Sequence, residues 1–246
     1  DGGNTDDGIA VVTVVDAIDP SITCPADVSV TTNSGCTATG VVLGTPTSAD
    51  NCSVASVTNN APAAFPIGTT VVTWTVTDNS GNSATCTQNV TVTDASAPVI
   101  VACPSNISLS AGAACTAVAT WTAPTVNDNC NGATITQTAG PVSGSAFPLG
   151  VSTITYTATD GSGNTSTCSF TVTVLDATVP VVVDCPSNIS LNAGSTCTAV
   201  ATWIAPTVTD NCSGATITQT AGLASGSAFP LGTSTITYTG TDGSGN

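Results

Sequence analysis

Cysteine and aspartate are the residues of this chain that can do chemistry. The 246-residue sequence contains 11 cysteines and 15 acidic residues, all of them aspartate, and it has no lysine, arginine or histidine. Thiols form disulfides or ligate metals, and carboxylates bind hard cations or act in acid–base catalysis. The formal net charge of -15 is not balanced by any basic side chain, so it must be screened by salt or neutralised by bound cations.

The missing basic residues exclude several classes of function. Lysine and arginine bind the phosphates of nucleic acids and of anionic lipids. Because the sequence has neither residue, we expect no nucleic-acid partner. Without histidine or lysine there is no base to activate a serine or cysteine nucleophile, so we expect no enzyme. No apolar run approaches the length of roughly 18 residues that a membrane-spanning helix needs, so we expect no membrane insertion.

The sequence repeats with a period of 82 residues. The segment CPSNISL begins at Cys103 and again at Cys185, and SGSAFPLG begins at Ser143 and again at Ser225. A more diverged copy begins 79 residues before Cys103, at Cys24. The predicted organisation is residues 1–16 as the last strand of a preceding module, then module 1 at 17–94, module 2 at 95–176, and module 3 at 177–246, truncated before its last strand.

Alternating apolar and polar residues predict short strands in each module. In module 2 these strands are expected at residues 98–103, 115–122, 133–138, 152–159 and 167–175. Ile154, Tyr156 and Ala158 share one face of their strand, as do Phe170 and Val172 of the next. The predicted fold class is all-β, with tandem immunoglobulin-like antiparallel β-sandwich modules that form an extended rod, because the junctions are short and end in proline.

Each module has four equivalent cysteine positions, and the fourth is missing from module 3. Four cysteines allow three pairings, and a metal site is the alternative, although no Cys-x-x-Cys pair occurs. We favour nested pairing, first with fourth and second with third, because the first and fourth lie on the opening and closing strands. The predicted disulfides are Cys24–Cys86, Cys36–Cys52, Cys103–Cys168, Cys115–Cys130 and Cys197–Cys212, with Cys185 bonded to a cysteine beyond the chain end. Disulfides predict a secreted protein, extracellular or at the cell surface.

The motifs CPSNI, DNC, SGSAFPLG, TYTATDGSGN and TCSFTVTV of module 2, in this order, resemble the hyalin repeat (HYR) module. The resemblance covers nearly the whole chain. It implies an immunoglobulin-like fold in an extracellular protein, an adhesive or structural role, and no catalytic residues. The four-cysteine form is similar to tandem arrays in large cell-surface adhesins of Bacteroidota. Animal members more often keep only the first and last cysteines, which supports the pair Cys103–Cys168.

Aspartates recur at equivalent places: before Asn-Cys, at the start of the last hairpin, and at the junctions between modules. One interpretation is calcium binding, for which the candidate ligands are Asp94, Asp176, Asp78 and Asp160. The alternative is that these residues cap turns and keep the surface soluble. The sequence therefore predicts no cofactor, and calcium is the candidate that these carboxylates leave open.

Two functions are consistent with these features. The first is a non-catalytic structural stalk in a long extracellular fibre or a cell-surface adhesin of the attachment or gliding type. Its partners would be neighbouring modules of the same chain and other copies in a fibre. The second is an adhesive module that recognises a surface glycan with the help of calcium. The near-identity of modules 2 and 3 favours the stalk, because a spacer needs only repetition.

Overall fold

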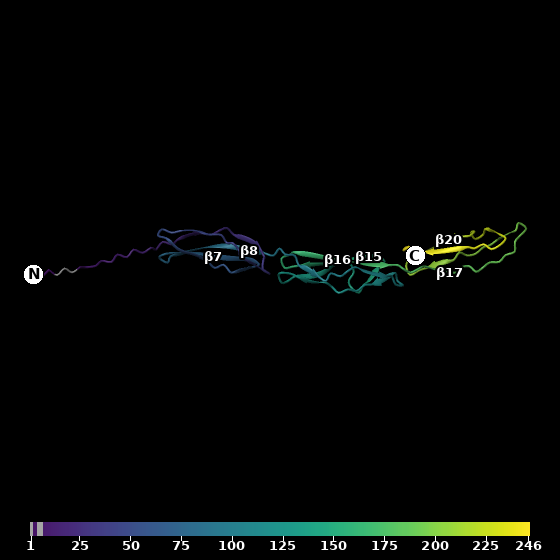
Figure 1. Ribbon diagram of the computed structural model, residues 1–246, viewed down its shortest axis with the longest axis horizontal. Coiled ribbons are helices and arrows are strands. Elements are labelled where there is room, and N and C mark those ends of the chain that lie inside the picture. Colours follow the sequence, from purple (N-terminus) through teal and green to yellow (C-terminus); the bar gives the residue numbers. More distant parts are fainter. Residues whose placement is uncertain (1, 4–6) are drawn as a thin grey trace. The chain divides into compact units, whose positions relative to one another are not determined.

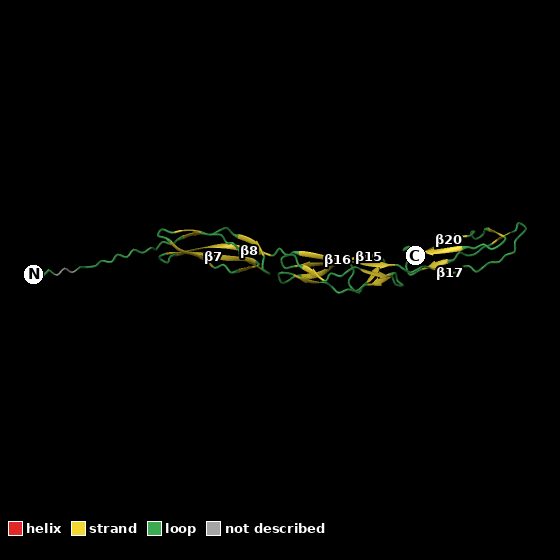
Figure 2. Ribbon diagram, viewed as in Figure 1, coloured by secondary structure: helices red, strands yellow, loops and turns green. Residues whose placement is uncertain are grey.

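The structure is a computed structural model that describes residues 2–3 and 7–246. These residues form strands and loops, with no helix among them (Figure 2). Threonine, valine and isoleucine dominate the strands, because β-branched side chains fit a pleated, half-buried surface. The described part of the chain accordingly contains no helix that could span a membrane.

The chain forms two compact units whose boundaries differ from those of the sequence repeats. The first unit holds module 1 together with two loops of module 2, Asp128–Ala133 and Thr159–Thr165. The second unit holds the rest of module 2 and module 3. Two loops of module 2 therefore pack with module 1, which places the contacts of this junction inside a single unit. The extended rod stays a prediction.

Module 1 is a sandwich of one larger sheet and two strand pairs. The sheet has the order β2-β8-β7-β5, and the pairs are β1–β4 and β3–β6. β7 and β8 lie side by side (Figure 1). The strands are β1 (Ser21–Thr23), β2 (Val28–Thr31), β3 (Thr37–Thr39), β4 (Thr47–Ala49), β5 (Val54–Asn59), β6 (Ala64–Pro66), β7 (Gly68–Asp78) and β8 (Ser83–Thr93).

Module 2 repeats this topology, with the sheet β10-β16-β15-β13 and the pairs β9–β12 and β11–β14. Each strand predicted for this module is present. The strands β10, β12 and β14 were not predicted, because three or four residues are too few to show alternation. The strands are β9 (Val99–Val101), β10 (Ile107–Ser110), β11 (Thr116–Val118), β12 (Thr125–Asn127), β13 (Thr134–Ala139), β14 (Ala146–Pro148), β15 (Gly150–Thr159) and β16 (Thr165–Leu175).

The sequence predicted antiparallel sheets, but the four-stranded sheets each contain one parallel pair. β2 runs parallel to β8, and β10 runs parallel to β16. The reason is a crossover near the start of each module. The opening strand pairs in one layer, as β9 does with β12, and the chain then joins the other layer beside the closing strand.

The predicted inward faces form the core of module 2. Ile154, Tyr156 and Ala158 are buried on β15, and Phe170 and Val172 are buried on β16. The core is completed from the opposite layer by Phe147 of β14 and Ala119, so the two layers close over one apolar cluster. Burial of this apolar surface is the main stabilising term for such a small sandwich.

The cores of modules 1 and 2 each contain a tryptophan whose indole N–H is hydrogen-bonded, but the partner residues differ. In module 2, the indole of Trp121 packs edge-on against Phe170, with ring centroids 5.1 Å apart, and donates to the Tyr156 hydroxyl at 2.8 Å. Module 1 has Trp74 on β7 and the fully buried Gln88 on β8 instead. The Trp74 indole donates to Gln88 at 3.1 Å, so its N–H is also satisfied.

Module 3 has the strand pairs β17–β19, β18–β21 and β20–β22. No strand among its described residues corresponds to β8 or β16, and Leu191 and Leu231 remain 52% and 80% exposed. Its strands are β17 (Val181–Val183), β18 (Thr198–Val200), β19 (Thr207–Thr209), β20 (Thr216–Ala221), β21 (Ala228–Pro230) and β22 (Thr237–Thr241).

The strand predicted within residues 1–16 is not found at residues 2–3 and 7–16, and residues 1 and 4–6 lie outside the described residues. Ile9, Val12 and Val14 are each more than 80% exposed. The equivalent strand, β16, is held between β10 and β15. Residues 7–16 have no such neighbours in the described chain, and a lone strand leaves its backbone groups unpaired.

Candidate functional site

The junctions between modules concentrate the cysteines and aspartates of the chain. Two disulfides link consecutive modules: Cys36 of module 1 is bonded to Cys130 of module 2, and Cys115 of module 2 is bonded to Cys212 of module 3. The second cysteine of one module is thus bonded to the third cysteine of the next. Because this pattern occurs at both junctions, it is a property of the repeat.

These bonds correct the predicted nested pairing. The structure contains Cys24–Cys86 and Cys103–Cys168 as predicted. It does not contain Cys36–Cys52, Cys115–Cys130 or Cys197–Cys212, and among the described residues Cys52, Cys185 and Cys197 are free. The bond from Cys185 to a cysteine beyond the chain end stays a prediction.

The nested prediction fails because the second and third cysteines of a module belong to different junctions. In module 1, Cys36 follows Gly35, whose carbonyl accepts a hydrogen bond from Asn129 of module 2. Cys52 instead hydrogen-bonds with Asp16, the residue just before module 1. Spacing along the sequence could not reveal this, since a pair within a module and a pair between neighbours repeat with the same period.

Asp94, the residue after β8, lies buried at the junction between modules 1 and 2 and is 6% exposed. Its Oδ1 accepts hydrogen bonds from the Ser96 amide at 3.0 Å, the Asn129 side chain at 3.2 Å and the Thr32 hydroxyl at 3.3 Å. Its Oδ2 is buried and has no hydrogen-bond partner in the described part of the chain. One oxygen of this carboxylate therefore has hydrogen-bond partners, and the other has none among the described residues.

Asp128 shows the same division. Its Oδ2 accepts from the Cys130 amide at 3.0 Å, and its Oδ1 is buried without a hydrogen-bond partner among the described residues. Single carboxylate oxygens of Asp94 and Asp128, together with the Cys130 sulfur, lie within 4.8 Å of one another. The disulfide removes Cys130 as a thiolate ligand. Two carboxylates thus share a buried space, and the sequence has no basic side chain to neutralise them.

The arrangement recurs at the other junctions. Asp176, Asp210 and Cys212 form the equivalent cluster between modules 2 and 3, and Asp16, Asp50 and Asp78 form one at the start of module 1. One oxygen of each junction aspartate is again buried and lacks a hydrogen-bond partner within the described residues: Oδ2 of Asp16 and Asp176, and Oδ1 of Asp50 and Asp210. The other oxygen of each accepts a hydrogen bond from a backbone amide.

The hairpin aspartates behave differently. Asp160 Oδ1 accepts from the amides of Ser162 and Asn164, and its Oδ2 accepts from the Asn164 side chain at 2.7 Å. Asp78 and Asp242 repeat these contacts. Burial raises the pKa of Asp160, but the hydrogen bonds from Asn164, Ser162 and Gly163 outweigh it and hold the pKa below 3.8. These carboxylates therefore cap turns, as one interpretation of the sequence proposed.

The free thiol of Cys52 lies beside the first acidic cluster. Its hydrogen bond with Asp16, together with burial and the nearby negative charges, raises its pKa above 9.0. The hydrogen bond from Asn51, followed by those from Ile18 and Cys52, lowers the pKa of Asp16 below 3.8. Cys52 is therefore a neutral thiol at physiological pH, whereas a nucleophilic or metal-bound cysteine is a thiolate.

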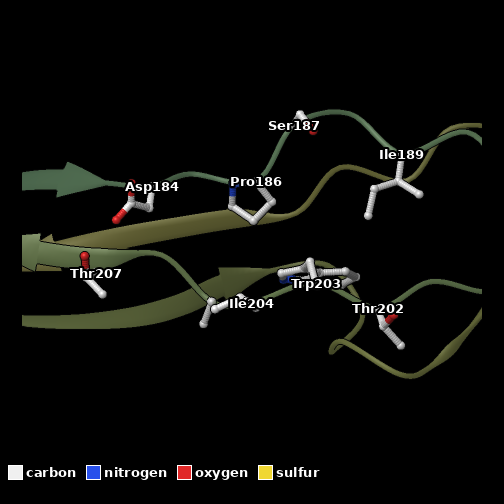
Figure 3. A pocket seen from close by; sticks show the side chains of 9 residues that line it. Asp184, Pro186, Ser187, Ile189, Thr202, Trp203, Ile204 and Thr207 are labelled. Carbon is white, nitrogen blue, oxygen red and sulfur yellow. The ribbon is translucent and has the colours of Figure 1, made fainter.

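The hollow of about 560 Å³ in module 3 is an open part of its core. Figure 3 shows Pro186 and Ile189 on one segment of its wall and Trp203 on another. In module 2 the equivalent tryptophan, Trp121, is covered by Phe170 of β16. Among the described residues, the aromatic ring that packs against Trp203 is that of Phe229, with ring centroids 5.9 Å apart, and the Trp203 indole donates to the Tyr238 hydroxyl at 2.8 Å. The apolar lining of the hollow is thus explained by an uncovered face of the sandwich, without a ligand.

Part of the acidic site was predicted from the sequence. Of the four calcium candidates, Asp94 and Asp176 lie in junction clusters, and Asp78 belongs to the cluster at the start of module 1. The fourth, Asp160, has its oxygens used by the hairpin. The calcium candidates did not include Asp16, which was noted as a junction aspartate, or the aspartates noted before Asn-Cys, which are Asp50, Asp128 and Asp210. The recurring Asp-Asn-Cys motif was visible, but nothing in the spacing placed it beside the junction aspartate.

Comparison with known proteins gives the family of this chain. The family model for the HYR domain matches three consecutive segments, residues 15–92, 93–174 and 175–246. The chain therefore belongs to the HYR domain family. It is 37% identical to hyalin of Strongylocentrotus purpuratus over 96% of its own length and 20% of that protein. It is 33% identical to hyalin of Lytechinus variegatus over 99% of its length and 48% of that protein. The chain thus spans less than half of either relative.

Among solved structures, the chain is similar to four extracellular cadherin domains of protocadherin gamma B7. The sequence identity is 15%, the TM-score is 0.33, and the alignment covers 88% of this chain and 70% of that one.

Proposed function

We propose that this chain is a non-catalytic structural segment of a long extracellular fibre or cell-surface adhesin. Its role would be to carry load between other parts of the assembly, as a stalk does. The observation that carries the proposal is the pair of bonds Cys36–Cys130 and Cys115–Cys212, each of which joins consecutive modules. Membership of the HYR family and the similarity to hyalin over nearly the whole chain support it.

Several further features support this role. Stable disulfides belong to oxidising compartments, which agrees with an extracellular location. The acidic clusters contain no histidine or lysine that could serve as a catalytic base, because the sequence has neither. The four-cysteine repeat is similar to tandem arrays in large cell-surface adhesins of Bacteroidota, and we propose that the chain belongs to a surface protein of this kind.

The crossed disulfides give the chain a short covalent path. Cys115 precedes Cys130 in the sequence, so the path runs from residue 1 to Cys36, crosses to Cys130, returns to Cys115, and crosses to Cys212. It uses roughly a third of the residues. At ~3.5 Å per residue, it extends to roughly 300 Å, against roughly 860 Å for the reduced chain. Even an array whose modules unfold under load would then keep most of its chain unextended.

Single-molecule stretching of the oxidised 246-residue chain tests the proposal. We expect a maximum extension near 300 Å, and an increase to roughly 420 Å in Cys115→Ser with Cys212→Ser, which leaves only the bonds within modules on the path. The reduced chain supplies the upper limit. An oxidised wild-type chain that extends as far as the double variant would show that the junction bonds carry no load.

The second candidate, recognition of a surface glycan, is supported by no described feature, because the hollow in module 3 is an uncovered core. Binding of the purified chain to an immobilised glycan, measured on an array, would favour it over the stalk.

A further inference from the structure

The junction clusters contain a feature that the proposed stalk does not explain. Asp94 is 6% exposed and Asp176 is 8% exposed, so both carboxylates are more than nine-tenths buried. Each has an Oδ2 without a hydrogen-bond partner in the described chain. A buried, ionised oxygen without a partner is strongly unfavourable, because it has lost its hydration and gained nothing in return.

The second feature is the place where these oxygens lie. A carboxylate oxygen of Asp94 lies within 4.8 Å of one from Asp128, and the same holds for Asp176 and Asp210. The facing aspartates also keep a buried oxygen unpaired, in the part of the chain that is described. Like charges this close repel each other, and the repulsion is stronger where water is excluded.

The unpaired oxygens occur in a regular pattern. At each of the three positions, one partner is the aspartate at the module boundary and the other is the aspartate of the Asp-Asn-Cys motif. In each aspartate one oxygen is fixed by backbone amides and the other is left unpaired. The amide hydrogen bonds orient the carboxylates, as happens where a carboxylate is held for a metal.

We propose that each of these pairs binds a calcium ion: Asp16 with Asp50, Asp94 with Asp128, and Asp176 with Asp210. Calcium takes oxygen ligands at about 2.3–2.6 Å, so two ligands of one ion lie up to about 5 Å apart, which accommodates carboxylate oxygens that lie within 4.8 Å of each other. The ion neutralises both carboxylates and uses the oxygens that the protein leaves unpaired. Water and backbone carbonyls complete the coordination shell, since calcium needs six to eight ligands.

Two carboxylates per ion imply modest affinity. Extracellular modules bind calcium with dissociation constants on the order of 0.1–1 mM, and we expect values in this range. Each site also joins residues on the two sides of a module boundary. Calcium would thus hold the two junctions that the disulfides hold, and also the boundary at Asp16, beside which Cys52 is free. Its binding is independent of whether the chain serves as a stalk.

Equilibrium dialysis of the oxidised, chelator-treated chain against calcium chloride in 0.15 M sodium chloride tests the proposal. We expect three bound ions per chain at saturation, and thermal unfolding at a higher temperature in 5 mM calcium than in chelator. The variants Asp50→Asn, Asp128→Asn and Asp210→Asn should each remove one ion. Asparagine keeps the acceptor for the backbone amide but replaces the unpaired oxygen with an N–H donor.

The variants carry an internal check on folding. In chelator, Asp128→Asn should unfold at or above the wild-type temperature, because the new amide can donate to Asp94 and a repulsion is removed. In calcium it should gain less than the wild type. The matched control is Asp27→Asn, which removes the same charge from an exposed carboxylate whose two oxygens already accept from Asn89. It should still bind three ions.

Three results would overturn the proposal. The wild-type chain could unfold at the same temperature in calcium and in chelator, with no calcium retained in dialysis. The triple variant at Asp50, Asp128 and Asp210 could bind as many ions as the wild type. Asp27→Asn could lose as much calcium as Asp128→Asn, which would mean that the ions only screen the net charge.

Discussion

Buried polar groups inside the modules and at the junctions differ in whether the chain supplies their partners. Inside module 1, the Trp74 indole donates to Gln88, whose side-chain amide in turn donates to the carbonyls of Ala26 and Leu43. Inside module 2, Trp121 donates to Tyr156. At the junction, Asp94 and Asp128 each keep a buried oxygen without a partner among the described residues.

This difference separates two levels of stability. A module interior is complete once its two layers close, because its apolar surface is buried and its polar groups are paired. A junction needs something more than the chain, and disulfides and cations can supply it. The module interior and the junction should therefore respond to different changes.

The largest effect is expected from the interior of module 2. Phe147 is fully buried and packs edge-on against Trp121, with ring centroids 6.0 Å apart. We expect Phe147→Ala to lower the free energy of unfolding by about 3–5 kcal/mol, measured by urea denaturation, through lost burial and a residual cavity. The loss should be equal in calcium and in chelator. The exposed Leu149→Ala is the control, and a loss of similar size there would contradict the assignment of the core.

The disulfides provide the next comparison. Replacing Cys103 and Cys168 with serine should destabilise module 2 by about 4 kcal/mol, because their bond closes a long loop. Replacing Cys115 and Cys212 should destabilise module 2 by less, although their separation of 97 residues is longer, because part of that loop lies in module 3, which need not unfold with module 2. Denaturation followed by the fluorescence of Trp121, in chains whose Trp74 and Trp203 are replaced with phenylalanine, reports on this module. Equal losses in the two variants would remove the distinction between interior and junction bonds.

A smaller effect is expected at the buried amide of module 1. Gln88→Leu leaves the Trp74 indole N–H and the carbonyls of Ala26 and Leu43 without their partner. We expect a loss of about 1–3 kcal/mol in the unfolding free energy, the usual range for a buried polar group left unsatisfied. A neutral result would mean that the interior of module 1 tolerates unpaired groups as the junction does.

The smallest effect concerns the hairpin aspartates and acid. The pKa of Asp160 is lowered in the folded chain, so its contribution to stability is complete above 3.8 and is lost as the pH falls through its folded pKa. Between about pH 5 and about pH 3, the unfolding temperature of the wild type should therefore fall more than that of Asp160→Asn. Identical slopes for the two proteins would show that the capping hydrogen bonds do not favour the ionised carboxylate.

The alternation of apolar residues was sufficient to predict most of the fold. Ile154 and Phe170 face the core as expected, since a period of two is visible in a long strand. β10 and β14 were missed because a short strand is defined by its neighbours. The parallel pairing of β10 with β16 depends on a crossover between layers, which has no local sequence signal.

The site was harder to predict than the fold. The disulfide between Cys36 and Cys130 and the approach of Asp94 to Asp128 both join residues of different modules. In a repeated sequence, a contact within one module and a contact with the next have the same period. Only the three-dimensional arrangement shows which of the two occurs, and the nested pairing was the wrong one.

Disulfide mapping of the oxidised chain tests the account most directly. Trypsin has no site in the sequence, but cleavage before each aspartate places Cys36 in peptide 27–49, Cys52 in 50–77, Cys130 in 128–159 and Cys212 in 210–241. The account predicts that 27–49 is linked to 128–159, and that the peptide with Cys115, 94–127, is linked to 210–241 under non-reducing conditions. A link between 27–49 and 50–77, or between 94–127 and 128–159, would contradict it.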